Sequence, residues 1–178
     1  KAASTFNPEK LLWLNQQHMM RMEPARIVPH LRYQLERLGI DTDDTELLQG
    51  VIVAQRERTR TLKEMAEKSR YFFVDEIDLD PKAAAKHLTR ETAPVLEQVQ
   101  ARLERLAQWT ASAIHDELSA LAEQLGVGLG KVAQPLRVAV SGGTVSPPID
   151  QTVALLGRDR TLARLERALQ TARSNGAS

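Results

Sequence analysis

The sequence predicts an all-α protein built from two helical lobes. Aromatic residues make up only 4% of the 178 residues, whereas the helix-favouring Leu, Ala, Glu, Gln and Arg recur throughout. Apolar residues recur at intervals of three and four, and Pro, Gly, Ser, Thr and Asp stand where helices would begin or end. A chain of this length forms one domain or two small ones and can bury a sizeable core.

The first part of the chain contains the pattern of two helices. Asn7 and Pro8 supply an N-cap and a preset first turn, so a helix is expected from there to near Pro24. A second helix should follow and end at Gly39, where a left-handed C-terminal residue is expected. Its apolar stripe consists of Val28, Leu31, Leu35 and Leu38.

Two further helices complete the predicted first lobe. One carries the apolar stripe Leu47, Leu48, Val51 and Ile52. The other begins at Thr61, which forms a capping box with Glu64, and is expected to continue through residues 71–73. The following residues, 74–80, contain four acids and no base, and this change in composition indicates a boundary, which we place between residues 76 and 77.

The second lobe is expected to begin with a short helix that Asp80 and Pro81 start and Leu88 ends, followed by a longer one from about Pro94. The next helix should end at Gly126. Residues 126–148 show glycine, proline and short apolar runs, with one short strand candidate at 137–140. Two closing helices are predicted from Ile149, Val153, Leu156, Leu162, Leu165 and Leu169. A disordered tail is expected from about residue 174.

Composition excludes several classes of protein. The chain carries 24 Lys+Arg against 23 Asp+Glu, a formal net charge of +1, so neither a polybasic nor an acidic tail describes it. The absence of Cys excludes a disulfide framework, a thiolate zinc site and a cysteine nucleophile, and fits a cytoplasmic protein. No apolar run approaches the ~18 residues that span a bilayer, so no membrane partner is expected.

No catalytic or metal-binding motif is complete. The run 126–131 lacks the third glycine of a dinucleotide fingerprint, and Leu125 and Val132 break the pattern of a Walker loop. The run 141–143 lacks the leading glycine of a nucleophile elbow. The histidines form no metal-binding pair; they are His18, His30, His87 and His115. We therefore predict no catalytic residue and no metal site.

Charge is distributed unevenly along the chain. Residues 56–70 contain six Lys or Arg against three Glu, a local charge of +3, and residues 126–148 contain two bases and no acid. Such stretches suit contacts with phosphates and with the splayed bases of a single-stranded RNA loop. On charge alone, a solvated helix face is the more common explanation.

Three stretches carry a family resemblance: Phe6–Asn15 (FNPEKLLWLN), Thr61–Phe73 (TLKEMAEKSRYFF) and Gly130–Val140 (GKVAQPLRVAV), the last followed by a Ser-Pro turn. In order and spacing they resemble the C-terminal, anticodon-binding half of bacterial glutamyl-tRNA synthetase, a class I aminoacyl-tRNA synthetase. The resemblance runs from residue 1 to about 170. It implies a helical cage of two anticodon-binding subdomains, 23–76 and 77–178, preceded by a stem-contact segment, 1–22.

The enzymes of this family attach glutamate to tRNA with ATP and Mg²⁺, through HIGH-like and KMSKS-like motifs. Neither motif occurs in these residues. The resemblance therefore implies a C-terminal portion of a longer ligase, which binds glutamate tRNA as a monomer but is inactive alone and holds no cofactor of its own.

The resemblance also places Arg58 on the arginine that reads the third anticodon base. In the family this residue separates glutamate tRNAs, which end in C, from glutamine tRNAs, which end in G. The chemistry agrees, because a guanidinium has only donors, cytosine presents acceptors at O2 and N3, and guanine presents donors at N1 and N2. The alternative for Arg58 is an exposed helix charge paired with a glutamate, and Arg56 or Arg60 takes the role if the register is shifted.

In the second lobe the resemblance implies that Arg137 contacts the anticodon and that a turn and an apolar residue hold neighbouring bases. These residues are Ser146, Pro147 and Ile149. Alternatively, Ile149 only begins a core stripe and Pro147 only starts a helix. Contacts with phosphates are expected from Lys1, Lys10 and Lys131.

Two functions of other classes remain open from the residues alone. A noncatalytic helical adaptor would use the same apolar stripes to pack against protein partners. An independent enzyme would need a catalytic constellation, which the sequence lacks.

Overall fold

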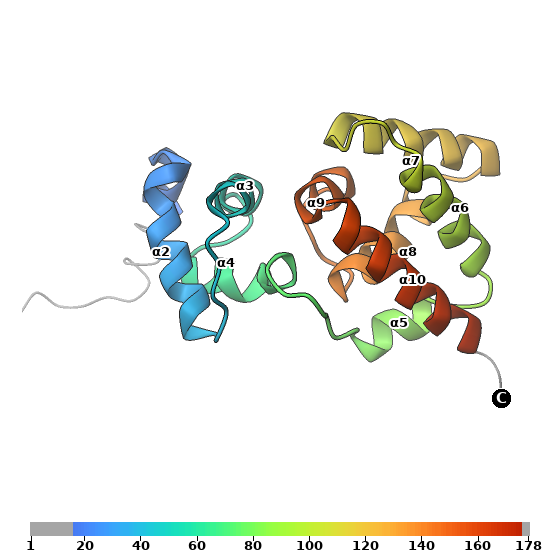
Figure 1. The fold of residues 1–178 in the computed structure, drawn as a ribbon, viewed down its shortest axis with the longest axis horizontal. Helices are drawn as coiled ribbons and strands as arrows, with labels where there is room; N and C mark the ends of the chain where they lie inside the picture. The colour runs from blue at the N-terminus through green and yellow to red at the C-terminus, as the bar shows by residue number, and fades with distance from the viewer. Residues whose placement is uncertain (1–15, 176–178) are drawn as a thin grey trace, which may run out of the picture. The chain divides into compact units, whose positions relative to one another are not determined.

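The computed structural model describes residues 16–175, and within that range the chain forms helices and no strand, which confirms the all-α prediction (Figure 1). The chain divides into two compact units, residues 1–74 and 75–178, each with its own core. The division falls within the acidic segment 74–80. None of the helices in the described part is long and apolar enough to cross a membrane.

The first unit packs one helix against two others. Residues 16–21 are helical, and α2 (Pro24–Arg37) then lies against both α3 (Thr45–Gln55) and α4 (Leu62–Lys68). Gly39 has a φ of +79° just after α2, as the sequence predicts, and the Asp44 carboxylate accepts from Leu47 N at 3.0 Å to begin α3. The largest fully buried side chains here are Ile27, Leu31, Leu35, Leu48, Ile52, Met65 and Phe72.

The fourth predicted helix is shorter than expected. The chain leaves α4 at Ser69 and continues as a 3₁₀ turn, η1 (Arg70–Phe72). Ser69, at this break, is fully buried, and its hydroxyl accepts from Gln55 Nε2 at 3.2 Å. The tighter turn leaves Tyr71, Phe72 and Phe73 all buried.

The capping box is only half as predicted. Thr61 Oγ1 accepts from Glu64 N at 3.0 Å, but the Glu64 carboxylate accepts from Arg60 N at 2.8 Å, one residue before Thr61. Thr61 therefore caps the start of α4, while the Glu64 carboxylate accepts a hydrogen bond from the backbone of the preceding turn.

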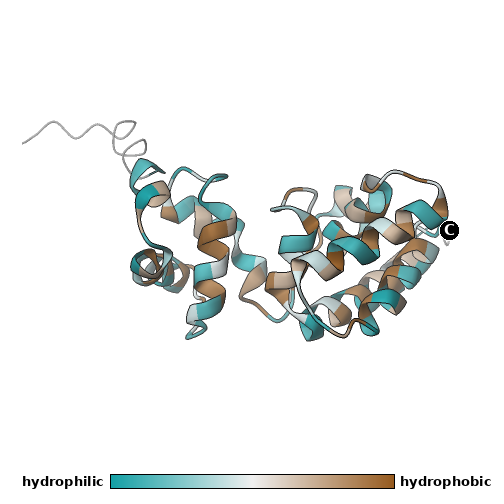
Figure 2. Ribbon diagram, turned by 90° about the horizontal axis from the view of Figure 1, so that it is seen from above, coloured by the Kyte–Doolittle hydropathy of each residue, from teal (hydrophilic) through white to brown (hydrophobic). Residues whose placement is uncertain are grey.

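The second unit surrounds one buried helix. It consists of α5 (Pro81–His87), α6 (Ala93–Glu104), α7 (Ala111–Leu125), α8 (Gly130–Ser141), α9 (Ile149–Leu156) and α10 (Arg158–Ser174). All of the others contact α8, whose residues from Val132 to Val140 are mostly buried. Figure 2 shows the outer helices with apolar and hydrophilic residues on different sides, the usual pattern of helices that cover a core.

The strand candidate at 137–140 is wrong, because these residues lie in α8. Val138 and Val140 suggest a strand by their β-branched side chains. Both are fully buried, and Arg137 is the single polar residue among these four, so the stretch alone is too short to show a helical period. Tertiary packing therefore overrides local preference here.

The described part of the chain ends at residue 175, close to where a disordered tail is expected. Ser174 is the last residue of α10, and the Asn175 side-chain amide donates to Leu88 O at 2.8 Å. Residues 176–178 lie outside the described range.

Gly142, directly after α8, has a backbone that only glycine adopts without strain. Its φ is +87°, and a Cβ there would overlap with the carbonyl oxygen of Asp78. Its own carbonyl accepts from Asp80 N at 2.8 Å. Residues 78–80 therefore cross the end of α8 in direct backbone contact.

Replacing this glycine should destabilise the second unit strongly. Gly126→Ala introduces only the cost of a positive φ, about 1–2 kcal/mol, because nothing lies within 4 Å of the added Cβ. Gly142→Ala adds a steric overlap of about 1–3 kcal/mol, so we expect a total loss of about 2–5 kcal/mol. Urea unfolding followed by circular dichroism measures both losses. Gly143→Ala, with open space and no positive φ, is the control and should change stability by less than about 0.5 kcal/mol.

Arg158 joins the start of α10 to the end of α6. Its guanidinium donates to the carbonyls of Leu103 and Glu104 at 3.1 and 3.2 Å and to that of Leu106 at 2.5 Å. Its Cζ also lies 5.0 Å from the centroid of the Trp109 ring, whose Nε1 donates to Val153 O at 3.0 Å. One cation thus donates to two carbonyls in the last turn of α6 and to a third just beyond it, at the negative end of the helix dipole.

Arg158→Ala should lower the free energy of unfolding by about 2 kcal/mol, because these carbonyls lose a charged donor. Arg158→Lys should recover only part of the loss, since an ammonium lacks the planar fork that reaches several carbonyls. Chemical denaturation measures both. Arg105→Ala is the control, because the exposed Arg105 side chain bonds to Ala101 O of its own helix. Equal stability of the Arg158→Ala and Arg105→Ala variants would contradict a stabilising role of the hydrogen bonds from Arg158 to the end of α6.

Candidate nucleic-acid interface

The turn between α3 and α4 exposes two arginines around a buried threonine. Thr59 is only 1% exposed, and its hydroxyl donates to Gln55 O at 3.0 Å. The buried Gln55 in turn donates from Nε2 to Ser69 Oγ at 3.2 Å. The turn is therefore anchored to the core of the first unit, and it holds Arg58 and Arg60 at the surface.

Arg58 differs from Arg56 in what its side chain contacts. The Arg56 guanidinium donates to Met19 O and Met22 O at 3.4 and 3.2 Å, where the helical residues 16–21 end. Arg58 lies in the turn rather than on a helix, and its side chain forms no hydrogen bond or ion pair within residues 16–175. The geometry therefore leaves its donors facing solvent, whereas those of Arg56 cap a helix.

In the second unit, Arg137 joins α8 to the turn that follows it. Its Nε donates to Ser146 Oγ at 2.8 Å, and its Nη1 donates to Gln134 Oε1. The Gln134 amide also donates to Thr144 O at 3.2 Å. The structure thus brings Arg137 and Ser146 together, and it adds Gln134, which lies one helical turn before Arg137.

The other predicted residues of this turn are covered. Ser146 is 8% exposed, Pro147 is buried, and the fully buried Thr152 donates to Pro147 O at 3.0 Å. Ile149 lies in the core together with Val153 and Leu156, as the alternative interpretation holds. These residues fix the shape of the turn.

Val145 is the apolar residue that this turn presents to solvent. Its side chain is 74% exposed, and it is not among the contact residues that the sequence predicts. Its position between Gly143 and Pro147 was the available indication, because a large aliphatic residue is uncommon at the tip of such a turn. Gln134 could have been found from its spacing of three residues from Arg137 on a helix.

The remaining predicted contacts are only partly described. Lys131 is exposed in the first turn of α8, whereas Lys1 and Lys10 lie outside the described residues. Gly126, with a φ of +68°, ends α7 and begins the turn to α8, as expected for a C-cap rather than a phosphate loop.

The structure offers no metal site in the part that it describes. No group of three or more His, Cys, Asp or Glu residues comes together there. The pKa of His87 is lowered by burial and by the neighbouring Lys86, which favours the neutral imidazole.

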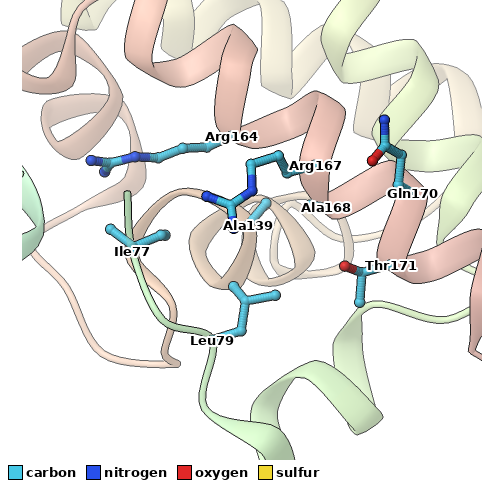
Figure 3. Close-up of a pocket in the computed structure, with 8 residues that line it drawn as sticks. All are labelled: Ile77, Leu79, Ala139, Arg164, Arg167, Ala168, Gln170 and Thr171. Carbon is cyan, nitrogen blue, oxygen red and sulfur yellow. The ribbon is translucent and has the colours of Figure 1, made fainter. Parts of the chain in front are cut away.

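A cavity of about 150 Å³ lies in the second unit between the segment 77–79, α8 and α10 (Figure 3). Arg164 is only 3% exposed at this place and donates to Val140 O at 2.8 Å, so it caps the end of α8. None of the predicted contact residues lines this cavity.

Comparisons with known proteins agree on one family. A family model described as an anticodon binding domain matches residues 21–169. A protein named glutamate–tRNA ligase 1 from Alkalilimnicola ehrlichii is 54% identical over 168 residues, 94% of this chain and 36% of that protein. One named glutamate–tRNA ligase 2 from Halorhodospira halophila is 48% identical over 174 residues, 98% of this chain and 37% of that protein.

A solved structure shows the same architecture. The crystal structure of a glutamate tRNA ligase from Elizabethkingia meningosepticum, in complex with its amino acid, matches with a TM-score of 0.83 and 28% identity. The match covers 97% of this chain and 34% of that one. The chain thus spans about a third of the length of the proteins it matches. Since the family model covers most of the sequence and the resemblance to the synthetases is confirmed, the chain belongs to the anticodon-binding-domain family.

Proposed function

We propose that this chain binds the anticodon loop of glutamate tRNA as the recognition part of a glutamate–tRNA ligase. The observation that carries the proposal is the turn at Arg58, which presents a guanidinium on a backbone anchored through the buried Thr59. Glutamate tRNA is proposed as the partner because the relatives are named glutamate–tRNA ligases. The anticodon is proposed as the contacted part because the matching family model is described as an anticodon binding domain.

Arg58 is proposed to select the third anticodon base. Its donors match O2 and N3 of cytosine, whereas guanine would present N–H groups to them. Leaving desolvated donors unmatched costs about 1–3 kcal/mol each, which corresponds to roughly ten- to hundredfold discrimination. Because the backbone of the turn is already fixed, little backbone conformational entropy is lost on binding.

Arg137 is proposed as the contact of the second unit. Ser146 and Gln134 hold its guanidinium in place, which reduces the entropy that it loses when it meets a base or a phosphate. The exposed side chain of Val145 is proposed to contact a base. Pro147 and Ile149 are buried and hold the turn in its conformation. Phosphate contacts are proposed for Lys131, Lys1 and Lys10.

The ATP-dependent attachment of glutamate belongs, in this proposal, to the remainder of a longer protein. The chain itself takes part in recognition as a cytoplasmic monomer and needs neither ATP nor Mg²⁺ of its own. A helical adaptor for protein partners is not favoured, because the family model and the relatives concern tRNA.

Arg58→Ala should abolish the preference for cytosine. We expect the unchanged chain to bind glutamate tRNA transcripts with C at the third anticodon position roughly ten- to hundredfold more tightly than those with G, and the variant to bind both within about twofold. Filter binding measures the four affinities. Arg60→Ala is the matched control, because it removes the same charge from the same exposed turn and should keep the preference. Equal affinities of the unchanged chain for the C and G transcripts would contradict the assignment of Arg58.

Arg137→Ala should weaken binding of the anticodon stem-loop about tenfold, because a charged hydrogen bond is lost. Ser146→Ala should weaken it less, about threefold, since the guanidinium remains but is held by fewer contacts. Titration of labelled stem-loop by fluorescence anisotropy gives the affinities, and Arg105→Ala controls for net charge. If the Arg137→Ala and Arg105→Ala variants bind alike, Arg137 is not a contact.

A further inference from the structure

The outer face of α2 carries a basic and aromatic stripe. Arg26, His30, Tyr33 and Arg37 follow one another at intervals of four, three and four residues, so they share one face of the helix. All four are exposed, Tyr33 to 57%. The opposite face buries Ile27, Val28, Leu31 and Leu35, and α2 packs with that side against α3 and α4 (Figure 1).

Helix stability does not account for this stripe. Arg26 lies in the first turn of α2, where the positive end of the helix dipole repels a cation, and that turn contains no acid. The N-cap residue Glu23 makes no capping hydrogen bond that would offset this cost. Arg37, in the last turn, is favoured by the dipole and lies near the Tyr33 ring, but Arg26 gains nothing from its position in the helix.

The charges on this face lack acidic partners among residues 16–175. The ion pairs found there join Lys68 to Glu64, Arg102 to Glu117, Arg160 to Asp75 and Arg173 to Glu97. The stripe itself carries Arg26 and Arg37 and no acid, a charge of +2 with a neutral His30. The Arg37 Cζ lies 6.0 Å from the centroid of the Tyr33 ring, so a cation and an exposed aromatic face lie side by side.

We infer that this face of α2 is an RNA-contacting surface additional to the turns at Arg58 and Arg137. Arg26 and Arg37 contact phosphates, and Tyr33 stacks on an unpaired base between them. The two arginines are separated along the helix by about 16 Å, roughly the rise of five stacked nucleotides. The inference rests on the proposed tRNA binding and adds a contact to it.

Charge complementarity favours RNA over a protein as the occupant. The stripe carries two guanidinium groups and no carboxylate, so its charge is complementary to a polyanion such as the phosphate backbone of RNA. Aromatic stacking together with phosphate contacts is the usual way in which proteins hold unpaired nucleotides.

The test is the salt dependence of binding to a glutamate tRNA transcript. For the Arg26→Ala/Arg37→Ala double variant we expect about tenfold weaker binding. The slope of log affinity against log KCl concentration should be smaller in magnitude by about 1.5, because each phosphate contact contributes about 0.7–0.9 to that slope. Tyr33→Ala should lose about tenfold in affinity with an unchanged slope, since stacking releases no counterions. The matched control is Lys82→Ala/Arg105→Ala, which removes the same two charges from exposed positions of the second unit and should keep the slope.

A charge reversal separates RNA contact from folding. Arg26→Glu places an anion at the positive end of the helix dipole, so its Tm should not fall while its affinity for tRNA does. If this variant instead melts at a lower temperature and loses binding only in proportion to its unfolded fraction, the inference is overturned.

The outcomes also separate this inference from the proposed function. If the unchanged chain does not bind the transcript, or binds it without regard to Arg58, the proposed function fails. If binding depends on Arg58 but the α2 double variant keeps the slope of the unchanged chain, the proposed function stands and the inference about α2 is wrong. Variants that bind tRNA normally but no longer associate with the N-terminal remainder of a full-length relative would assign the face to protein contact and overturn the inference.

Discussion

The second unit depends on how the end of its buried helix is closed. At the C-terminus of α8 the Gly142 carbonyl accepts from Asp80, and the Val140 carbonyl accepts from the buried Arg164. Carbonyl groups at a helix end that is covered by other helices must find donors inside the protein, because water cannot reach them. The segment 78–80 and α10 supply these donors. The same closure determines where the following turn leaves α8, and that turn holds Arg137.

Local rules predict the helices that begin and end in exposed places. Asp80 and Pro81 start α5 as expected, and Gly39 and Gly126 end their helices in left-handed conformations. These rules fail where burial decides the conformation. The stretch 137–140 resembles a strand because three of its four residues are apolar and buried in α8, and the helix that begins at Thr61 breaks at the buried Ser69. The hydrogen bond that Ser69 accepts from Gln55 spans fourteen positions, so no local pattern could reveal it.

The candidate contacts show the same division between what is local and what is not. The family resemblance named Arg58, Arg137 and Ser146 as candidates, and the hydrogen bond between Arg137 and Ser146 comes from the structure. It could not show that Arg56 caps the end of the helical residues 16–21, because that contact joins residues more than thirty positions apart. Nor could it show that Ile149 is buried while Val145 is exposed, since both are β-branched aliphatic residues only four positions apart. The exposure of a side chain is decided by the packing of the whole unit.

The link from Thr59 through Gln55 to Ser69 has a consequence for how the first unit fluctuates. Each of these polar groups is buried and has its partner only in the native arrangement. A local opening that released the Arg58 turn would therefore strand polar groups in an apolar interior. The turn and the core around Ser69 accordingly open and close together, as one cooperative substructure. The surface that is proposed to read a nucleotide is then as persistent as the hydrophobic interior beneath it, and it differs in this respect from an ordinary surface loop.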